Sequence, residues 1–435
     1  MAQPKSSLNI IIVGAGIAGL STYLHLQKYC SPLVDLKITI YESYNLATKR
    51  SAEDATFQEL SSSSLLTGGG LGLSPNGMRI LHELDEDLYT NVKASGFLAE
   101  KFVFKSSRGW RLNVAPTGDG RGKKGNPPGK EEVCLAVSRQ GLRDTILEAV
   151  GLEKVVYKKV VKARMAEYSQ GKKAAVVFED GSEDEADLII GADGVRSEVL
   201  RGIFNCDDEE MMPKPYYEGL IGVGGFIDGP IPEEIKNEKS MVFVFGPNGF
   251  FGYGATSEDQ AMWWSTCQSD DLPEKRKITP EEMKSQLKSR HGSWKDPIIQ
   301  DIIENADVEQ IYPVWTVPEL QRWGNNGLVV IGDAAHALQP TSGQGSSQAL
   351  EDAKCLSLIL SMLLKKRMEG TVDASLTDTI ELSFKVFYDV RQPRIDKIVQ
   401  RTKMMAQSKK DMSLAQEMTV LLMLWLMGKI PAIGT

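Results

Sequence analysis

Three glycines near the start of the chain have the spacing of a nucleotide-binding turn. Gly14, Gly16 and Gly19 follow a short apolar run and precede an apolar helical pattern. In such a unit the first glycine permits a tight turn, the second lets the backbone approach a pyrophosphate, and the third lets helix and strand pack closely. The N–H groups at the start of the helix then face the anion. The pattern predicts a dinucleotide site.

An acid at the end of the next apolar run, Glu42, supports this interpretation. It lies at roughly the 20-residue offset expected of a carboxylate that accepts hydrogen bonds from ribose hydroxyls. Such an acid favours a ribose without a 2′-phosphate, and therefore FAD or NAD rather than NADP at this site. A glycine turn selected only for packing would explain neither the acid nor its position.

The stretch "GADGVRS" also ends an apolar run with an acid and a glycine, Asp193 and Gly194. Glycine at this place admits a close approach of the backbone. Arg196 follows, and a guanidinium beside a cofactor cleft can clamp an anionic or polar substrate group. A strand-to-helix turn with a good cap is the alternative interpretation.

A third stretch, "GDAAHALQPTSGQGSSQALEDA", begins with Asp333 after a predicted buried strand. Its carboxylate suits a polyhydroxyl chain, whereas it would repel phosphate. Gly343 and Gly345 then open a helix whose backbone amides and dipole favour negative charge. The edge of a reduced flavin ring carries such charge, so this stretch suits the flavin end of FAD.

Composition narrows the class of protein. A chain of 435 residues favours two or three domains, and a net charge of -8 argues against a nucleic-acid groove. Five scattered cysteines without a CxxC pair indicate a reducing, cytoplasmic location and no zinc site. The four histidines lack metal-ligand spacing, so we expect no metal.

The most apolar window of the chain runs from Val420 to Met427. It is far shorter than the roughly 20 residues that span a bilayer. A helix docked on the core is the favoured interpretation, with contact to a membrane surface as the alternative.

The three motifs occur in an order that resembles the FAD-dependent aromatic hydroxylases, the class A flavoprotein monooxygenases related to p-hydroxybenzoate hydroxylase and salicylate hydroxylase. The stretches "GGGLGLSPNGMRIL" and "VSRQGLRDTIL" are similar to two further segments of that family. The similarity covers most of residues 8 to 365.

The resemblance implies a role for each matching residue. Gly14, Gly16, Gly19 and Glu42 would hold the ADP half of FAD. Arg139 would reach the linking chain of the flavin, Asp333 the ribityl or pyrophosphate region, and Gly343, Gly345 and Ser346 the isoalloxazine edge. Asp193 and Gly194 match a motif implicated in binding both FAD and pyridine nucleotide. Gly70 is a further flavin contact by this resemblance, although the gap before it is longer than in the family. Arg196 is a catalytic candidate. Tyr253, in an aromatic meander, is the best candidate for a substrate-facing hydroxyl, with an ordinary sheet residue as the alternative.

The implied fold class is α/β, a Rossmann-like FAD-binding domain with an inserted, mostly antiparallel β-sheet substrate domain and C-terminal helices. The expected boundaries are 1–90, 133–205 and 309–365 for the FAD-binding domain, 91–132 and 206–308 for the substrate domain, and 366–435 for the C-terminal helical region.

The implied activity is that of an FAD-dependent monooxygenase that uses NADPH or NADH and O2. It would hydroxylate or epoxidise a small aromatic, indole or alkene substrate through a flavin C4a-hydroperoxide, and a role in secondary metabolism fits the resemblance. The alternatives are a flavin-dependent reductase, dehydrogenase or halogenase on the same fold, or a non-catalytic binding protein like the GDP dissociation inhibitors. "PVWTVP" lacks the first tryptophan of the WxWxIP element expected of a halogenase.

Overall fold

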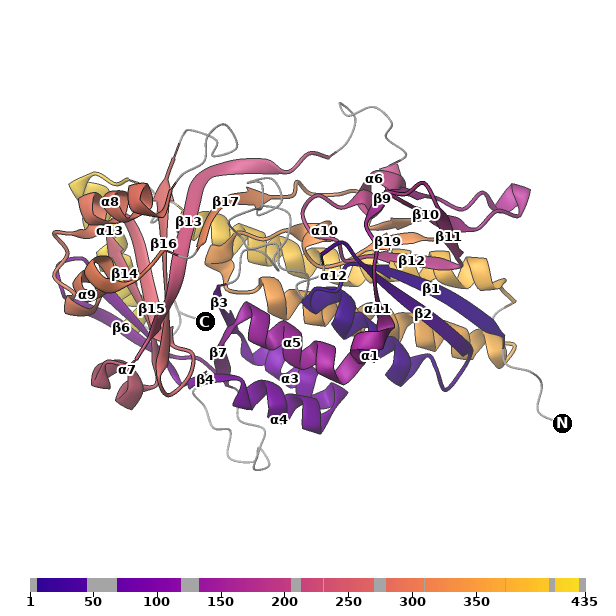
Figure 1. Cartoon of the computed structure of the whole chain (residues 1–435), viewed down its shortest axis with the longest axis horizontal. Helices are drawn as coiled ribbons and strands as arrows, with labels where there is room; N and C mark the ends of the chain where they lie inside the picture. The colour runs from indigo at the N-terminus through magenta and orange to yellow at the C-terminus, as the bar shows by residue number, and fades with distance from the viewer. Residues whose placement is uncertain are drawn as a thin grey trace.

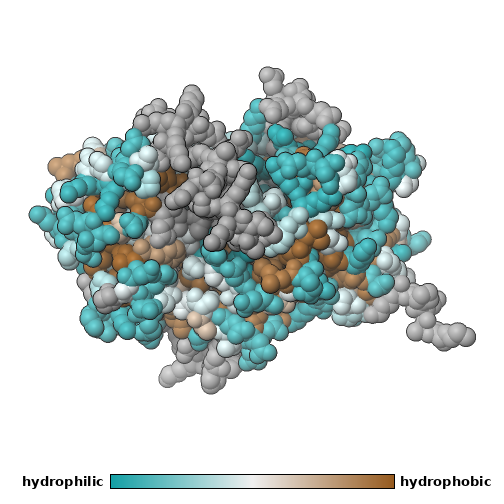
Figure 2. All heavy atoms as spheres, in the orientation of Figure 1, coloured by the Kyte–Doolittle hydropathy of each residue, from teal (hydrophilic) through white to brown (hydrophobic). Residues whose placement is uncertain are grey.

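A computed structural model of the chain describes residues 6–44, 69–118, 133–204, 213–229, 231–269, 279–308, 310–371, 373–406 and 411–429. Two large sheets lie at opposite ends of the molecule, with helices between and around them (Figure 1). On the face seen in Figure 2, hydrophilic residues are interspersed with hydrophobic patches. The fold is a mixed α/β fold.

The first sheet has six strands in the order β18-β19-β12-β1-β2-β8. Its members are β1 (Ser7–Val13), β2 (Asp35–Glu42), β8 (Val155–Tyr157), β12 (Leu188–Gly191), β18 (Gly324–Asn325) and β19 (Leu328–Val330). All pairings are parallel except that of β18, the edge strand. Strands β12 and β19 are buried along their whole length, which explains why they read as continuous apolar runs.

Helices cover one side of this sheet. They are α1 (Ile17–Tyr29), α5 (Arg139–Val150) and α11 (Gly345–Met368), with α3 (Pro75–Leu84), α4 (Glu86–Ala94) and α12 (Leu376–Ala406) packed against them. Side-chain caps begin several helices: the Ser138 hydroxyl accepts from the Gly141 N–H at the start of α5, and Asp85 accepts from Leu88 at the start of α4.

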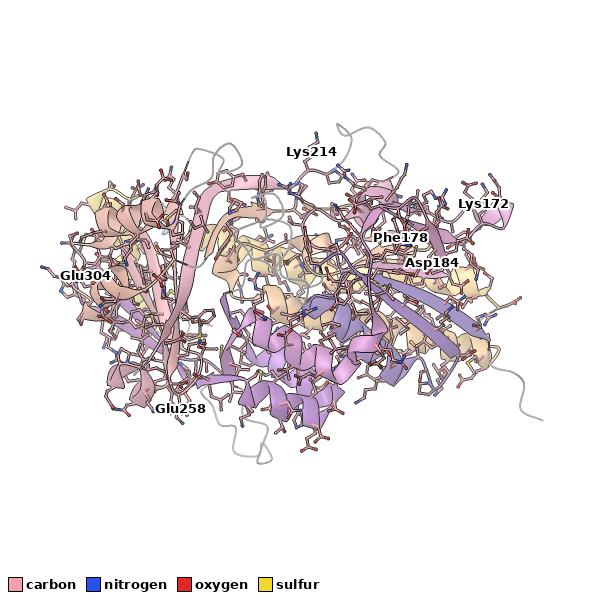
Figure 3. All side chains as sticks on the ribbon, viewed as in Figure 1. Lys172, Phe178, Asp184, Lys214, Glu258 and Glu304 are labelled. Atoms are coloured by element: carbon pink, nitrogen blue, oxygen red, sulfur yellow. The ribbon has the colours of Figure 1, made fainter. Side chains whose placement is uncertain are left out.

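A three-stranded antiparallel sheet packs against the other side. It consists of β9 (Val160–Arg164), β10 (Ala174–Phe178) and β11 (Glu183–Ala186), with short 3-10 turns at Leu152–Lys154 and Tyr168–Gln170 nearby. Phe178 and Asp184, labelled in Figure 3, come from this sheet. The Tyr41 ring meets Phe178 edge-on at 4.7 Å, and its hydroxyl donates to Asp184 at 2.8 Å, so Tyr41 ties the two sheets together.

The second large sheet has seven strands in the order β17-β13-β16-β15-β14-β5-β6. Its members are β5 (Lys101–Ser106), β6 (Arg111–Pro116), β13 (Tyr216–Asp228), β14 (Ser240–Gly246), β15 (Gly249–Ala255), β16 (Gln260–Gln268) and β17 (Gln310–Thr316). The pairings are antiparallel except that of β14 with β5, which is parallel, so the sheet is mixed. The meander expected from Tyr216 to Cys267 corresponds to β13 to β16.

The two faces of the seven-stranded sheet meet different partners. On the outer face, α8 (Pro280–His291) and α9 (Pro297–Asn305) close a second core, and α7 (Glu233–Glu238) lies at one end. The Thr279–Glu282 capping box begins α8, and Asp296 caps α9. The inner face is turned toward the six-stranded sheet. A small sheet of β3 (Gly70–Leu73), β7 (Cys134–Ser138) and β4 (Gly96–Ala99) lies between the two bodies (Figure 1).

The apolar C-terminal window forms part of α13 (Leu414–Lys429). Leu421 and Leu424 are buried against Phe245 and Phe250 of the seven-stranded sheet, which confirms the docked helix for this side. The opposite side is exposed, with Met423 60% accessible. Within the described residues, no helix combines the length and the apolar character that crossing a bilayer needs.

Two buried histidines predict acid sensitivity. Burial lowers the pKa of His25 to about 4, and burial together with the charge of Arg290 lowers that of His291 to about 3. The unfolded chain, with ordinary values near 6.5, therefore binds more protons than the folded chain between about pH 6.5 and pH 4. Stability is expected to fall as the pH falls through this window, so the urea midpoint should be lower at pH 5 than at pH 7. An equal midpoint at both values would contradict the buried, neutral state of the two rings.

Candidate functional site

A cavity of about 630 Å³ lies between the carboxyl ends of the six-stranded sheet and the inner face of the seven-stranded sheet. It lies in the region where the predicted motifs converge. Its lining includes the predicted positions Gly16, Glu42, Gly70, Arg139, Asp193, Gly194, Asp333, Gly343, Gly345 and Ser346. Gly14 and Gly19 lie behind the lining, and Arg196 and Tyr253 do not contribute to it.

The three glycines of the first turn have separate structural reasons. Gly14 has φ +103°, and a Cβ there would lie 2.4 Å from the carbonyl oxygen of Ala192. A Cβ on Gly19 would lie 2.0 Å from the carbonyl oxygen of Gly14. A Cβ on Gly16 would meet no protein atom within 4 Å, because it would point into the cavity. Gly14 and Gly19 therefore permit the turn, and Gly16 leaves room for a ligand.

Glu42 both lines the cavity and shapes the turn. Its Oε2 accepts a hydrogen bond from the Ala15 N–H at 2.7 Å, and its Oε1 accepts one from the Tyr44 N–H at 3.0 Å. The Gly14 N–H donates to the Tyr41 carbonyl at 2.7 Å. The glycine turn is thus held to the end of β2, a contact that the sequence analysis did not anticipate for this carboxylate.

Two helix N-termini without a side-chain cap open into this cavity. They belong to α1, which begins after Gly16, and to α11, which begins at Gly345. Gly343, just before α11, has φ +58°, and neither Gly343 nor Gly345 has an atom near its missing Cβ. The first N–H groups of a helix have no partner within the helix. Both ends therefore present donors and a positive dipole to one elongated space.

A buried ionic network lies behind the segment from Asp333 to Ser346. Asp352 on α11 accepts hydrogen bonds from the Gly332 N–H at 2.9 Å and from Arg391 Nε at 2.7 Å, and lies 2.6 Å from His336 Nε2. Burial opposes ionisation of Asp352, but the charges of His336 and Arg391 outweigh it and lower the pKa to about 2. The structural role expected of His336 is consistent with this contact. It lies on α10 (Asp333–His336), a single helical turn.

Helix α3 holds the same segment from the opposite side. The side-chain Nε2 of Gln344 donates to Ser74 Oγ at 3.0 Å, and the backbone N–H of Ser74 donates to Ser347 Oγ at 3.1 Å. Asn76 Nδ2 donates to Glu351 Oε1 at 2.7 Å. These residues belong to the stretch "GGGLGLSPNGMRIL", whose similarity to the family gave no role to its serine or asparagine. A 3-10 turn at Pro340–Ser342 connects α10 to α11.

Asp193 has two tasks in the structure. Its Oδ2 accepts hydrogen bonds from the Glu198 N–H at 2.8 Å and the Val199 N–H at 3.3 Å, at the start of α6 (Glu198–Phe204). Its Oδ1 is buried and has no hydrogen-bond partner within the described part of the chain. Burial raises the pKa of this carboxyl, against the opposing hydrogen bonds. Asp193 therefore caps a helix as well as lining the cavity, in keeping with both interpretations of its motif.

The inner face of the seven-stranded sheet forms an apolar wall of the cavity. The wall consists of Phe102, Phe104, Met241, Phe243, Phe245, Phe250, Met262, Trp264, Tyr312 and Trp315. Glycines allow its largest rings to lie flat: a Cβ on Gly252 would be 2.3 Å from the Trp264 ring, and one on Gly222 would be 2.4 Å from the Tyr312 ring. Arg196 lies over the Trp315 ring at 5.6 Å and does not line the cavity itself. Such a wall suits an apolar, ring-containing ligand.

Tyr253 does not face the cavity. It points to the outer face of the sheet, where its hydroxyl donates to Asp296 Oδ2 at 3.0 Å and accepts from Lys105 Nζ at 3.2 Å. Side chains alternate between the faces of a strand. Phe250 of the same strand lines the cavity, and a Cβ on Gly252 would point toward Trp264, which lines it too. The prediction of a substrate-facing Tyr253 is therefore corrected: Tyr253 is a buried sheet residue beneath α9.

The described residues fit FAD. The open space beside Gly16 and the uncapped start of α1 suit the pyrophosphate, and the uncapped start of α11 suits a negatively charged ring edge. Residues 147–382 match the model of the FAD binding domain family, and the chain belongs to this family.

Known relatives give this family membership an activity. The chain is 26% identical over 361 residues to aurachin C monooxygenase/isomerase of Stigmatella aurantiaca, covering 82% of each chain. It is 24% identical over 383 residues to the chloroplastic zeaxanthin epoxidase of Nicotiana plumbaginifolia, covering 87% of this chain and 52% of that protein. The chain thus spans about half the length of that epoxidase. It is an FAD-dependent monooxygenase.

A solved structure shares the fold. HpxO of Klebsiella pneumoniae, in complex with FAD and uric acid, matches with a TM-score of 0.75 and 18% sequence identity. The match covers 98% of this chain and 95% of that one.

Proposed function

We propose that this chain uses NADPH or NADH and O2 to insert one oxygen atom into an apolar aromatic, indole or alkene substrate. In hydroxylation, a substrate C–H, O2, NAD(P)H and a proton give a C–OH, water and NAD(P)⁺. In epoxidation, the same oxygen atom adds across a C=C bond. Bound FAD supplies the oxygen-transfer chemistry, and the protein positions the substrate and excludes water. A cytoplasmic location and a role in secondary metabolism remain part of this proposal.

The main support for this proposal is that one cavity has two sides of different chemistry. One side has two uncapped helix N-termini and open glycines, and the other is a wall of aromatic and methionine side chains. We assign the ADP half of FAD to Gly16 and Glu42, and the flavin to Gly343, Gly345 and Ser346. Gly70 of β3 supports this placement. A Cβ on Gly70 would lie 2.0 Å from Sδ of Met262, so the side with the glycines and the apolar wall come into contact at this residue.

The domain assignment follows the same division. We propose that the six-stranded sheet and its helices bind FAD, and that the seven-stranded sheet with α7, α8 and α9 is the inserted substrate domain. Because β17 pairs with β13, residues 310–316 belong with the substrate domain, and the third FAD-binding segment begins after them. The C-terminal region divides likewise, since α12 packs on α11 and α13 packs on the seven-stranded sheet.

An oxygen-electrode assay tests the activity. The purified protein should be yellow, and candidate aromatic substrates should stimulate NAD(P)H oxidation with O2 uptake and a product heavier by one oxygen atom. Substrate reduction or oxidation without O2 uptake would instead indicate a flavin reductase or dehydrogenase. A colourless protein that takes up no FAD would revive the non-catalytic alternative.

Asp333 offers a test of the flavin end. Its carboxylate is exposed at the cavity, where we propose that it accepts a hydrogen bond from the ribityl chain. Asp333→Ala should weaken FAD binding by on the order of 10-fold, since hydrogen bonds to charged groups contribute about 1.5–3 kcal/mol. Titration of the apoprotein with FAD measures this. An unchanged dissociation constant would remove Asp333 from the site.

For Arg196 we propose a catalytic role that acts on turnover rather than on FAD. Its position over Trp315 places it beside the aromatic wall, although outside the cavity lining.

A further inference from the structure

The apolar wall of the cavity includes the polar side chain of Tyr312. Tyr312 lies on β17, opposite Gly222 of β13. Its ring rests on that glycine, because a Cβ on Gly222 would be 2.4 Å from two ring carbons and 2.7 Å from the hydroxyl oxygen. The side chain is therefore held flat against the sheet, with one edge at the cavity.

The hydroxyl of Tyr312 makes no hydrogen bond to a described residue, yet it is not sealed off from the cavity. The cross-strand row that begins at Tyr312 continues through Gly222 and Thr266 to Phe250. Burial raises the pKa of this phenol, against the opposing charge of Arg139. The group therefore remains a protonated hydrogen-bond donor at neutral pH.

Tyr253 shows what a purely structural tyrosine in this sheet looks like. Its hydroxyl donates to Asp296 and accepts from Lys105, on the face away from the cavity. A buried hydroxyl without such partners costs free energy, so buried phenols in proteins are normally paired. Tyr312 has no such partner among the described residues, and its hydroxyl is open to the cavity, where a bound ligand can accept its hydrogen bond.

We propose that the Tyr312 hydroxyl donates a hydrogen bond to an oxygen atom of the substrate. This inference rests on the proposed function and narrows its substrate class to an apolar ring system that carries a hydroxyl or carbonyl oxygen. The aromatic wall holds the rings, and the hydrogen bond fixes their orientation relative to the flavin. Tyr312 is thereby a substrate-binding residue that selects which carbon faces the flavin.

Two probe molecules that differ only in one hydroxyl group test the contribution of the substrate oxygen atom to binding. Binding of 2-naphthol and of naphthalene to the FAD-loaded protein is measured from the change in flavin absorbance or fluorescence. The wild-type protein should bind 2-naphthol on the order of 10-fold more tightly than naphthalene, the size of one good hydrogen bond. In Tyr312→Phe this difference should disappear, while the affinity for naphthalene and for FAD stays the same.

Two further variants control for general damage. Tyr253→Phe removes the same atom from the other face of the sheet and should leave the preference for 2-naphthol intact. Gly222→Ala retains the hydroxyl but forces the Tyr312 ring into the cavity, so it should weaken binding of both probes. A Tyr312→Phe protein that still prefers 2-naphthol would overturn the proposal, as would a wild-type protein that shows no preference. These binding measurements need no turnover, so a failure of the monooxygenase assignment would be seen separately, in the oxygen-electrode assay.

Discussion

Replacing Arg391 by methionine should lower the free energy of unfolding by about 3–5 kcal/mol, the usual cost of leaving one member of a buried ion pair alone. Arg391 is 3% exposed and binds Asp352 Oδ1 at 2.7 Å, Glu351 Oε2 at 2.5 Å and Gln348 Oε1 at 2.7 Å. Asp352 is fully buried. In the variant it would keep His336 and the Gly332 N–H as partners but lose the Arg391 guanidinium. The urea midpoint of the apoprotein, followed by far-UV circular dichroism, measures the loss.

Arg394 provides the matched control, because it lies on the same helix and binds Glu351 but is half exposed. Exposed pairs contribute about 0–1 kcal/mol, so Arg394→Met should shift the midpoint little. If both substitutions lowered the urea midpoint equally, the buried contacts of Arg391 would stabilise the fold no more than the exposed contact of Arg394. We also expect the Arg391→Met variant to release FAD at a lower urea concentration than that at which it unfolds. The reason is that Asp352 accepts a hydrogen bond from Gly332, at the start of the segment that leads to Gly343–Ser346, the residues that we assign to the flavin.

Substituting alanine for Gly16 should abolish tight FAD binding while leaving the apoprotein folded. Gly16 has φ −79° and ψ −177°, a conformation open to any residue, and its Cβ would contact no protein atom within 4 Å. The added methyl group would instead enter the space that we assign to the pyrophosphate. Loss of close contact with a charged group corresponds to a rise in dissociation constant on the order of 10- to 100-fold.

Gly14→Ala separates this effect from damage to the fold. Its Cβ would lie 2.4 Å from the Ala192 carbonyl oxygen, and its φ of +103° is unfavourable for alanine. This variant should lower the thermal midpoint of the apoprotein as well as its affinity for FAD, whereas Gly16→Ala should lower only the affinity. If Gly16→Ala bound FAD normally, the ADP half would have to lie elsewhere in the cavity.

The glycine turns were predictable because their constraints are local. A tight turn, a strand before it and a helix after it lie within a few residues, as at Gly14 and Gly19. The acid at Glu42 was found from its spacing, but its hydrogen bond to the Ala15 N–H depends on how two strands align, which spacing alone does not define.

Tyrosine placement and the ionic network were not predictable for physical reasons. The meander was visible in the sequence, but which of its two faces meets the cavity depends on where the rest of the chain packs. Tyr253 and Gly252 are adjacent on β15 and therefore point to opposite faces of the sheet, so a shift of one residue would exchange their places. Arg391 is 39 residues from Asp352 along the chain, and only the packing of α12 on α11 brings them together.

The two faces of the seven-stranded sheet have different roles. Its outer face supports the fold through α8 and α9, while its inner face presents rings that lie over glycines such as Gly222 and Gly252. A single added methyl group at either glycine would displace one ring of the cavity wall. Small substitutions at these two positions are therefore expected to change which substrates fit, and they are natural starting points for altering substrate preference by design.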